Sequence, residues 1–562
     1  MTARAGVAAL LALAMSGCSR LDPADLVLLH ARIYPFAIDS ARVEAIAIRA
    51  GRIVYTGGDA GAEAYRGPDT RVIDLGGRPV LPGFHDTHVH PRGGISLAEC
   101  PLETLATRSA VLDSVRRCAS SHPDRPWIRG RGWELPVFPG ANPRREWLDA
   151  VVPDRPVYLS ASDGHSAWVN SRALEIARIT AATGDPPNGR IERDAAGNPT
   201  GTLRESAMEL VARHLPPYSP AEIRDGLERG LALANRAGIT TVHEASADTT
   251  LLAAYAELAG DGRLTARVVA AMTVDPLGGL RQTGSLRAWR DRFARHPLLR
   301  PTAVKIVADG VIEAKTAALL EPYGDGSGSR GAPNFTPASL DSIVAALDAA
   351  GFQIHAHAIG DGAVRMMLDA LEQARRLNGP RDARPIIAHL QLIHPDDLPR
   401  FARLGVVASF QPLWAWADTY IIDLTIPVLD SARSSRLYPI GSLARAGARL
   451  AAGSDWPVSS INPFEAIQVA LTRRAPEDSV AGPAWLPEER VDLPTMLRAY
   501  TTNGAWAAGD EASNGTLEVG KAADLIVLDR DPHGIPVRLL HQTRVLLTLV
   551  DGREVWRDSN LP

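Results

Sequence analysis

The stretch PGFHDTHVH at residues 82–90 decides the fold, because it ends in His88 and His90, which are two residues apart in a predicted strand. Side chains alternate along a strand, so Asp86, His88 and His90 are expected on one face. Two imidazoles in this arrangement fit one metal ion. A pair of histidines is weak evidence for a metal site by itself. The prediction depends on whether other strands carry further metal-ligand residues that lie beside this pair.

Short apolar segments, most followed by helix-like stretches rich in Ala, Leu and Arg, continue through the chain. Alternating strands and helices are typical of a parallel sheet with crossover helices. Eight such units favour a closed (β/α)8 barrel over an open sheet. The expected strands are Val80–His90, Gly238–Glu244, Arg267–Val274, Thr302–Asp309, Gly351–Ala358, Pro385–Leu392, Gly405–Gln411 and Ala448–Asp455.

Metal-ligand residue types recur near the carboxyl ends of these strands, where such barrels assemble their active sites. His355 and His357 share one face of the fifth strand, His389 belongs to the sixth, and Asp455 ends the eighth. Imidazoles and carboxylates suit Zn²⁺, and a catalytic zinc keeps one position open for water. We therefore predict one or two divalent metal ions, most simply Zn²⁺, that activate water, with Asp455 as the proton shuttle.

Lys305 stands in the otherwise apolar fourth strand. A buried lysine is costly unless it is paired or chemically altered. One interpretation is a salt bridge with Asp309 or Glu313. The other is a lysine carboxylated by CO₂, which would bridge two metal ions.

Both ends of the chain have the pattern of a small sheet, with short apolar runs between glycine-containing turns. We expect residues 26–80 and 511–562 to pair into one β-sandwich beside a barrel that spans residues 81–510. Residues 94–223 are too long for a loop after the first barrel strand and carry strand and helix signals of their own. They are predicted to form an inserted subdomain at the mouth of the barrel.

Four side chains are candidates for contact with a substrate. Trp133 and His165 lie in the insert, Trp414 follows the seventh strand, and His355 shares its face with the fifth-strand ligand. Aromatic and imidazole groups at a pocket mouth can cover and orient a small molecule. The alternative is that Trp133 and Trp414 are packing residues.

The beginning of the chain resembles a bacterial export signal. Arg4 precedes an apolar run over residues 5–15 that is too short to span a bilayer. The sequence MSGC at residues 15–18 resembles a lipobox, although Met15 stands where Leu is usual. A soluble secreted protein, in which Cys18 is incidental, stays the alternative.

The lipobox predicts a signal peptide over residues 1–17, a lipid on Cys18 and a tether over residues 18–25. The protein would then be exported to the periplasm or cell envelope and contact the membrane through this anchor only. That compartment permits a disulfide, and Cys100 and Cys118 are the two cysteines available for one.

Composition narrows the class of partner. The 562 residues contain 60 Lys and Arg against 64 Asp and Glu, which gives a formal net charge of −4. This balance offers no basic field for nucleic acid. We expect a small-molecule substrate, and both a monomer and a homodimer stay open.

Several motifs taken together resemble the amidohydrolase superfamily, and within it the YtcJ-like branch typified by N-substituted formamide deformylase. They are PGFHDTHVH at 82–90, KIVADG at 305–310, HAIGD at 357–361, GSDWP at 453–457 and GKAADLIVLD at 520–529. The resemblance covers essentially the whole chain after about Leu26. It implies a barrel flanked by a β-sandwich, and metal-dependent hydrolysis of C–N bonds outside ordinary peptides.

The resemblance also implies a ligand set. It makes Lys305 the carboxylated, metal-bridging lysine and leaves His355 as the second choice for the ligand on the fifth strand. The residues that match the family's ligand positions are His88, His90, Lys305, His357, His389 and Asp455.

Two other functions remain open at this stage. The same activated water attacks esters, so a lactonase or esterase is one alternative. The other is a lipid-anchored solute-binding protein, which would tolerate the loss of Asp455, whereas a hydrolase would not.

Overall fold

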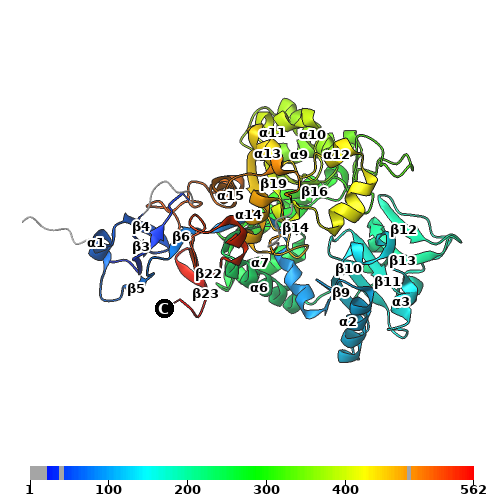
Figure 1. Cartoon of the computed structure of the whole chain (residues 1–562), viewed down its shortest axis with the longest axis horizontal. Coiled ribbons are helices and arrows are strands. Elements are labelled where there is room, and N and C mark those ends of the chain that lie inside the picture. The colour runs from blue at the N-terminus through cyan, green and yellow to red at the C-terminus, as the bar shows by residue number, and fades with distance from the viewer. Residues whose placement is uncertain (1–21, 37–42, 478–482, 562) are drawn as a thin grey trace, which may run out of the picture.

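The structure, a computed structural model, describes residues 22–36, 43–477 and 483–561. The predicted signal peptide, Cys18 and the start of the tether lie outside these residues. Three bodies follow one another along the molecule: a small β-domain, a central barrel and the inserted subdomain (Figure 1). None of the described helices combines the length and apolar character that crossing a bilayer requires.

The central body is an eight-stranded, all-parallel sheet in the order β20-β19-β18-β17-β16-β15-β14-β7. Its strands are β7 (Phe84–Val89), β14 (Ile239–Ala247), β15 (Arg267–Thr273), β16 (Leu299–Val307), β17 (Gln353–Ala358), β18 (Ile386–His389), β19 (Val407–Phe410) and β20 (Arg449–Ala452). Each predicted segment overlaps one of them, so the predicted barrel is confirmed.

Helices surround this sheet as crossover connections. The crossover helices include α6 (Pro220–Arg236), α7 (Thr249–Gly260), α8 (Gln282–Phe293), α9 (Pro337–Ala349), α10 (Asp361–Asn378), α11 (Leu398–Leu404) and α13 (Ile440–Arg445). Three further helices follow the last barrel strand: α14 (Pro463–Thr472), α15 (Leu493–Tyr500) and α16 (Thr502–Ala508). The helix α6 begins with Ser219 and Glu222 in a capping box, which satisfies free amides of its first turn. The insert therefore gives way to the barrel at Pro220, three residues before the boundary predicted from the sequence.

The barrel closes where the first and last strands meet. The amide of Asp455 donates to the carbonyl of His88 at 2.7 Å, and the amide of His90 donates to the carbonyl of Trp456 at 2.9 Å. Glycine is required beside this seam, because a Cβ on Gly453 would lie 2.6 Å from the His88 nitrogen. Closure therefore brings the motifs at 82–90 and 453–457 into direct contact.

The predicted strand Val80–His90 is in fact two strands, and this expectation is corrected. The strand β6 (Pro79–Pro82) belongs to the β-domain, and β7 belongs to the barrel. They separate at Gly83, where a Cβ would lie 2.3 Å from the side chain of Thr240. Both strands are fully buried and only Gly83 stands between them, so no longer turn in the sequence marked the change of sheet.

The β-domain consists of two sheets that share one apolar core. One contains N-terminal strands only, in the order β4-β3-β1-β5: β4 (Arg52–Gly57), β3 (Ala45–Arg49), β1 (Leu26–Leu29) and β5 (Arg71–Asp74). The other combines the two ends of the chain as β2-β6-β21-β22-β23, with β2 (Arg32–Ile33), β21 (Leu525–Leu528), β22 (Val545–Val550) and β23 (Arg553–Arg557). The predicted sandwich is present, with both chain ends in its second sheet.

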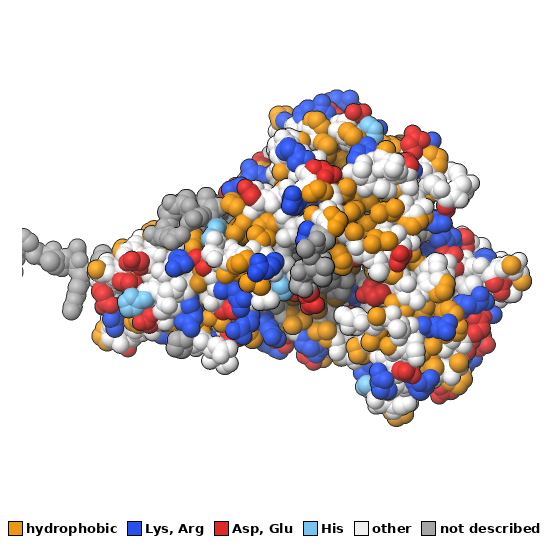
Figure 2. Space-filling view, in the orientation of Figure 1, with side chains coloured by type: hydrophobic (Ala, Val, Ile, Leu, Met, Phe, Trp, Pro, Cys, Tyr) orange, Lys and Arg blue, Asp and Glu red, His pale blue; other side chains and the backbone are white. Residues whose placement is uncertain are grey.

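The insert has its own sheet and core. The sheet order is β12-β13-β11-β10-β9-β8, formed by β12 (Gly189–Arg193), β13 (Pro199–Glu205), β11 (Ser166–Val169), β10 (Val157–Ala161), β9 (Ile128–Trp133) and β8 (Cys100–Pro101). A disulfide joins Cys100 to Cys118 in α2 (Arg108–Ser121). On the face drawn in Figure 2, acidic and basic side chains are interspersed, as the near-neutral composition predicts.

Candidate metal centre

The cluster of candidate ligands lies at the carboxyl ends of the barrel strands. His88 is in β7 and His90 follows it, Lys305 is in β16, and His357 and His389 are in β17 and β18. Asp455 comes three residues after β20. Residues separated by more than 360 positions in the sequence therefore converge on one end of the barrel.

His88, His90 and Asp455 form the tightest group. One ligand atom from each residue lies within 4.8 Å of the others. The carboxylate Oδ1 of Asp455 lies 3.1 Å from Nε2 of His90 and 3.6 Å from Nε2 of His88. This oxygen is buried and accepts no hydrogen bond from the described residues, so a cation bound between the two imidazoles would satisfy it. The donor set therefore fits a divalent metal.

Two further predicted ligands lie beside this group. The ring of His389 is centred 4.6 Å from that of His88 and 4.4 Å from that of His357. Nδ1 of His389 bonds Oε1 of Gln411 at 2.8 Å, which leaves its other ring nitrogen to bind a metal. The structure thus brings all three imidazoles together.

The ammonium of Lys305 lies 3.2 Å from Nε2 of His88. The side chain is buried, and burial lowers the pKa of Lys305 to about 8. Within the described residues it forms no salt bridge with Asp309 or Glu313. Asp309 instead accepts hydrogen bonds from backbone amides, including that of Ala318. The interpretation that Lys305 forms a salt bridge with this residue is therefore not supported.

Three of the four candidate ligand histidines are held in the neutral form that binds metal, whereas the carboxylates of Asp455 and Glu244 outweigh burial and raise the pKa of His90. Burial lowers the pKa of His88 well below its usual value, and the charge of Lys305 lowers it further. Burial has the same effect on His357 and His389. Neutral imidazole has a free lone pair, so these three side chains can bind a cation without first losing a proton.

The backbone around the ligands is unusual. Asp455 has a φ of 53° and His389 a φ of 77°, a region that residues other than glycine seldom adopt. Such conformations persist where the surrounding structure enforces them, and they are common at active sites. Here the contact of the Asp455 amide with β7 fixes the turn, and the carboxylate faces His88 and His90 as a result.

Three polar residues to which the sequence analysis assigned no role, Glu244, Asp86 and Ser454, hold the candidate ligands in position. Glu244, fully buried in β14, lies 3.4 Å from Nδ1 of His90. Asp86 accepts the hydroxyl of Ser454 at 2.6 Å and so ties β7 to the loop that carries Asp455. Glu244 could have been predicted as part of the site from its position near the carboxyl end of the second barrel strand.

His355, a candidate for substrate contact and second choice as ligand, has a different place. Its Nε2 bonds Nδ1 of His88 at 2.8 Å, behind the ligand cluster, and its side chain is fully buried. His357 is the residue of the pair that reaches the cavity. The prediction that His355 contacts substrate is therefore wrong, because it faces the back of the His88 ring.

A cavity of about 620 Å³ adjoins the ligand cluster, and both barrel and insert line it. His165 from the insert and Trp414 from the barrel contribute to its wall, and their contact with a substrate stays a prediction. Trp414 stacks on His389 with ring centres 5.7 Å apart. Burial opposes a charge on His165, but the carboxylate of Glu205 outweighs it and raises the pKa of His165 to about 9.

Trp133 does not reach this cavity, and its predicted role is corrected. Its side chain is fully buried in the core of the insert, against Phe138 and Trp168. Its indole nitrogen donates to the carbonyl of Leu159 at 3.0 Å. The packing alternative for Trp133 is therefore the correct one.

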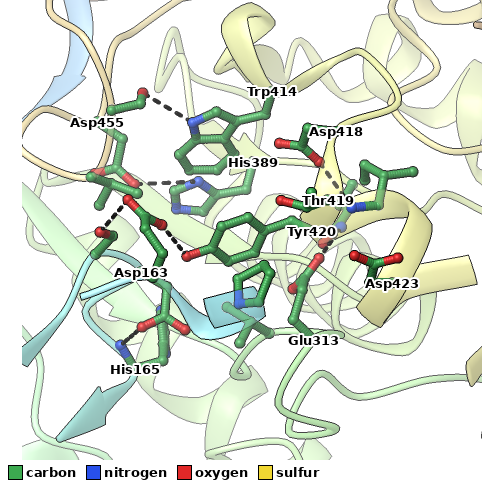
Figure 3. Close-up of a pocket in the computed structure, with 18 of the residues that line it drawn as sticks. Asp163, His165, Glu313, His389, Trp414, Asp418, Thr419, Tyr420, Asp423 and Asp455 are labelled. Atoms are coloured by element: carbon green, nitrogen blue, oxygen red, sulfur yellow. Dashed lines mark hydrogen bonds and ion pairs between the residues drawn. The ribbon is translucent and has the colours of Figure 1, made fainter. Parts of the chain in front are cut away.

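Sequence reasoning missed the acidic part of the wall. Figure 3 shows Asp455 and His389 on one side of the cavity and Glu313, Asp418 and Asp423 on the other. Glu313 and Asp418 stand in loops and Asp423 in the short π-helix η9 (Tyr420–Thr425), so no periodic strand or helix pattern pointed to them.

Comparison with known proteins places this geometry in a family. A model described as "Amidohydrolase family" matches residues 71–556. The chain is 33% identical over 550 residues to Protein LONG AFTER FAR-RED 3 of Arabidopsis thaliana, which covers 95% of this chain and 92% of the relative. It is 28% identical over 547 residues to N-substituted formamide deformylase of Arthrobacter pascens, and this alignment covers 94% of this chain and 97% of that protein.

A solved structure agrees with these matches. The uncharacterised metal-dependent hydrolase from Pyrococcus furiosus superposes with a TM-score of 0.67 at 26% identity, over 90% of this chain and 99% of that one. The family and the fold predicted from the motifs are therefore confirmed. The barrel, the ligand cluster and the family match agree that this chain belongs to the amidohydrolase family.

Proposed function

We propose that this protein hydrolyses a small-molecule amide, of the formamide or N-acyl type, with a divalent metal held at the carboxyl end of its barrel. The observation that carries the proposal is the buried Oδ1 of Asp455, which has no hydrogen-bond donor but faces two imidazoles. A carboxylate in that position is costly without a cation.

His88, His90, His357, His389 and Asp455 would hold the metal, which we take to be Zn²⁺ in one or two ions. When bound, such an ion lowers the pKa of a water molecule and polarises the bond under attack. Gln411 and His355 hydrogen-bond the ligand rings and fix their orientation.

Asp455 is the residue that moves protons in this proposal. It takes a proton from the attacking water and returns it to the nitrogen of the leaving amine. Among the described residues, its oxygens lie within 4 Å of the imidazoles of His88, His90 and His389, so the carboxylate faces the proposed reaction centre. Trp414 and His165 at the cavity wall would cover the bound amide and exclude solvent.

We also propose that Lys305 is carboxylated and bridges two metal ions. Its amine is buried beside His88, and no described carboxylate pairs with it. The modification would replace a buried cation by an oxygen ligand, which removes the charge conflict with the metal.

The test combines metal analysis with a paired substrate screen. Purified protein is assayed on N-formyl and N-acyl amines and on esters of the same acyl groups, before and after chelation. We expect about stoichiometric zinc, turnover of amides in preference to matched esters, and loss of activity in chelator that added zinc restores. Preference for the esters would support the lactonase or esterase alternative. Full activity in metal-free protein would overturn the proposal.

A further inference from the structure

The part of the cavity opposite the ligand cluster is acidic. Glu313, Asp418 and Asp423 line this part, and Glu134 and Asp163 also belong to the cavity wall. Neither lysine nor arginine is among the described residues that form the wall. Figure 3 shows Glu313, Asp418 and Asp423 grouped on the side of Tyr420 that faces away from Asp455.

These carboxylates have only neutral partners. Glu313 accepts the amide of Gln391 at 2.7 Å and the hydroxyl of Thr425 at 2.6 Å. Asp418 accepts the backbone amide of Ile421 at 2.9 Å. Within the described residues, neither of them forms a salt bridge. Burial raises the pKa of Asp418 to about 7, and the nearby charge of Glu313 adds to this effect.

A second observation points to a ligand in the same place. The side chain of Tyr438 lines the cavity and is only 4% exposed, yet its hydroxyl bonds to none of the described residues. The hydroxyl is therefore available to a polar group of a molecule bound in the cavity. The wall beside it is aromatic, because Trp416 and Tyr420 also face the cavity.

We propose that this end of the cavity binds a protonated amine on the substrate, so that the scissile amide sits at the metal ligands and an ammonium group sits between Glu313 and Asp418. The inference rests on the proposed hydrolysis for the position of the amide. An ammonium group has three donors, which the two carboxylates and the Tyr438 hydroxyl would accept. The rings of Trp416 and Tyr420 add cation–π attraction.

The binding of a cation also removes an energetic cost of the free protein. Two buried carboxylates close to each other repel and are poorly solvated. An ammonium group on the substrate reduces the repulsion between the carboxylates and replaces their lost solvation. An alkyl group of equal size does neither. The site therefore discriminates by charge, beyond the shape of the cavity.

The first arm of the test compares two formamides. N-formyl-1,5-diaminopentane carries the ammonium group, and N-hexylformamide replaces it by a methyl group. We expect kcat/KM to favour the cationic substrate by roughly 10- to 100-fold, the size of one or two hydrogen bonds to a charged group. Glu313→Gln and Asp418→Asn should each reduce this preference. Glu321→Gln, the same change on an exposed residue outside the cavity, should leave it intact.

The second arm does not depend on hydrolysis. Isothermal titration of the zinc-loaded protein with pentylamine and with pentan-1-ol compares two ligands that have no bond to cleave. Pentylamine should bind more tightly, and Asp418→Asn should weaken it, while Glu321→Gln should not.

The two arms separate the two proposals. If pentylamine binds through Glu313 and Asp418 but neither formamide is cleaved, the hydrolysis proposal fails and the amine site stands. If both formamides are cleaved at equal rates, and the titration is the same for pentylamine in wild type and Asp418→Asn, the amine site is overturned. Thermal melting of each variant confirms that it is folded.

Discussion

Asp455 is held in position by contacts that do not involve its own carboxylate. Its amide donates to the carbonyl of His88, and the adjacent Ser454 donates to Asp86. The side chain is therefore oriented by the seam of the barrel. An isosteric change at this position removes charge and basicity while it leaves the backbone contacts in place.

We expect Asp455→Asn to fold normally and to lose activity by roughly 10²- to 10⁴-fold, the usual contribution of a general acid–base. The amide cannot take a proton from water at neutral pH. The measurement is kcat on the best substrate of the screen, with the melting temperature as control. Hydrolysis at the wild-type rate would show that another group moves the proton.

Lys305 makes a chemical prediction. Incubation with ¹³C-bicarbonate should give one carbamate carbon resonance in the zinc-loaded protein, because the buried amine is expected to be carboxylated. Lys305→Met should lack this signal and bind less zinc. Lys315→Met is the matched control, since Lys315 is partly exposed and pairs with Asp325. A wild-type spectrum without the signal argues against the modification.

Asp418 gives a pH dependence with a defined sign. Its pKa is raised to about 7, so the carboxylate gains its charge as pH rises through neutrality. KM for the cationic formamide should therefore fall between about pH 6 and pH 8, relative to KM for the neutral one. In Asp418→Asn the ratio of the two KM values should stay flat. A wild-type ratio that does not change over this range contradicts the prediction.

The cluster of candidate metal ligands could be predicted from the sequence, whereas the acidic wall could not. His88, His357 and Asp455 stand at fixed places relative to strands, and the barrel rule converts such places into proximity. Glu313 and Asp418 stand in loops, where sequence position carries no direction for the side chain. His355 was misassigned because alternation puts it on the same face as His357, and depth along the strand decides which of them reaches the cavity.

Among the elements, the insert contributes most to the cavity beyond the barrel. Glu134, Asp163 and His165 reach the cavity from it. The segment between β8 and α2 adds Thr104 and Leu105, and the disulfide closes this segment at both ends. The bridge therefore supports part of the binding wall.

We expect the double variant Cys100→Ser with Cys118→Ser to be less stable by about 3 kcal/mol, the entropy expected for a loop of this length. The difference in the free energy of unfolding is measured by urea denaturation, from the transition in which the insert unfolds. KM should rise more than kcat falls, because the wall loosens while the metal ligands remain in the barrel. If stability and KM both match wild type, the bridge has no supporting role.

The strands of the barrel were predicted to within a few residues, because each is a buried apolar run between turns. The error at Val80–His90 has a physical cause. Buried strands of two different sheets carry the same apolar pattern, and only the close approach of Gly83 to Thr240 separates them. That approach is a long-range contact, which no local pattern contains.

For the whole molecule, the remaining proposal is export and lipid attachment. The disulfide of the insert is consistent with an oxidising compartment. Expressed in a bacterium that processes lipoproteins, the chain should incorporate labelled palmitate and partition into detergent. Cys18→Ala should abolish both. A wild-type protein that is unlabelled and stays in the aqueous phase would leave only the secreted, soluble alternative.

The second sheet of the β-domain can be completed only after the C-terminal strands have been synthesised. Its strand β6 has β21 as a neighbour, and more than 440 residues separate them in the chain. Synthesis therefore delivers the whole barrel before the partner of β6 exists. A chain that stops short of Leu525 would keep a bare strand edge beside the first ligand strand, open to pairing with another molecule.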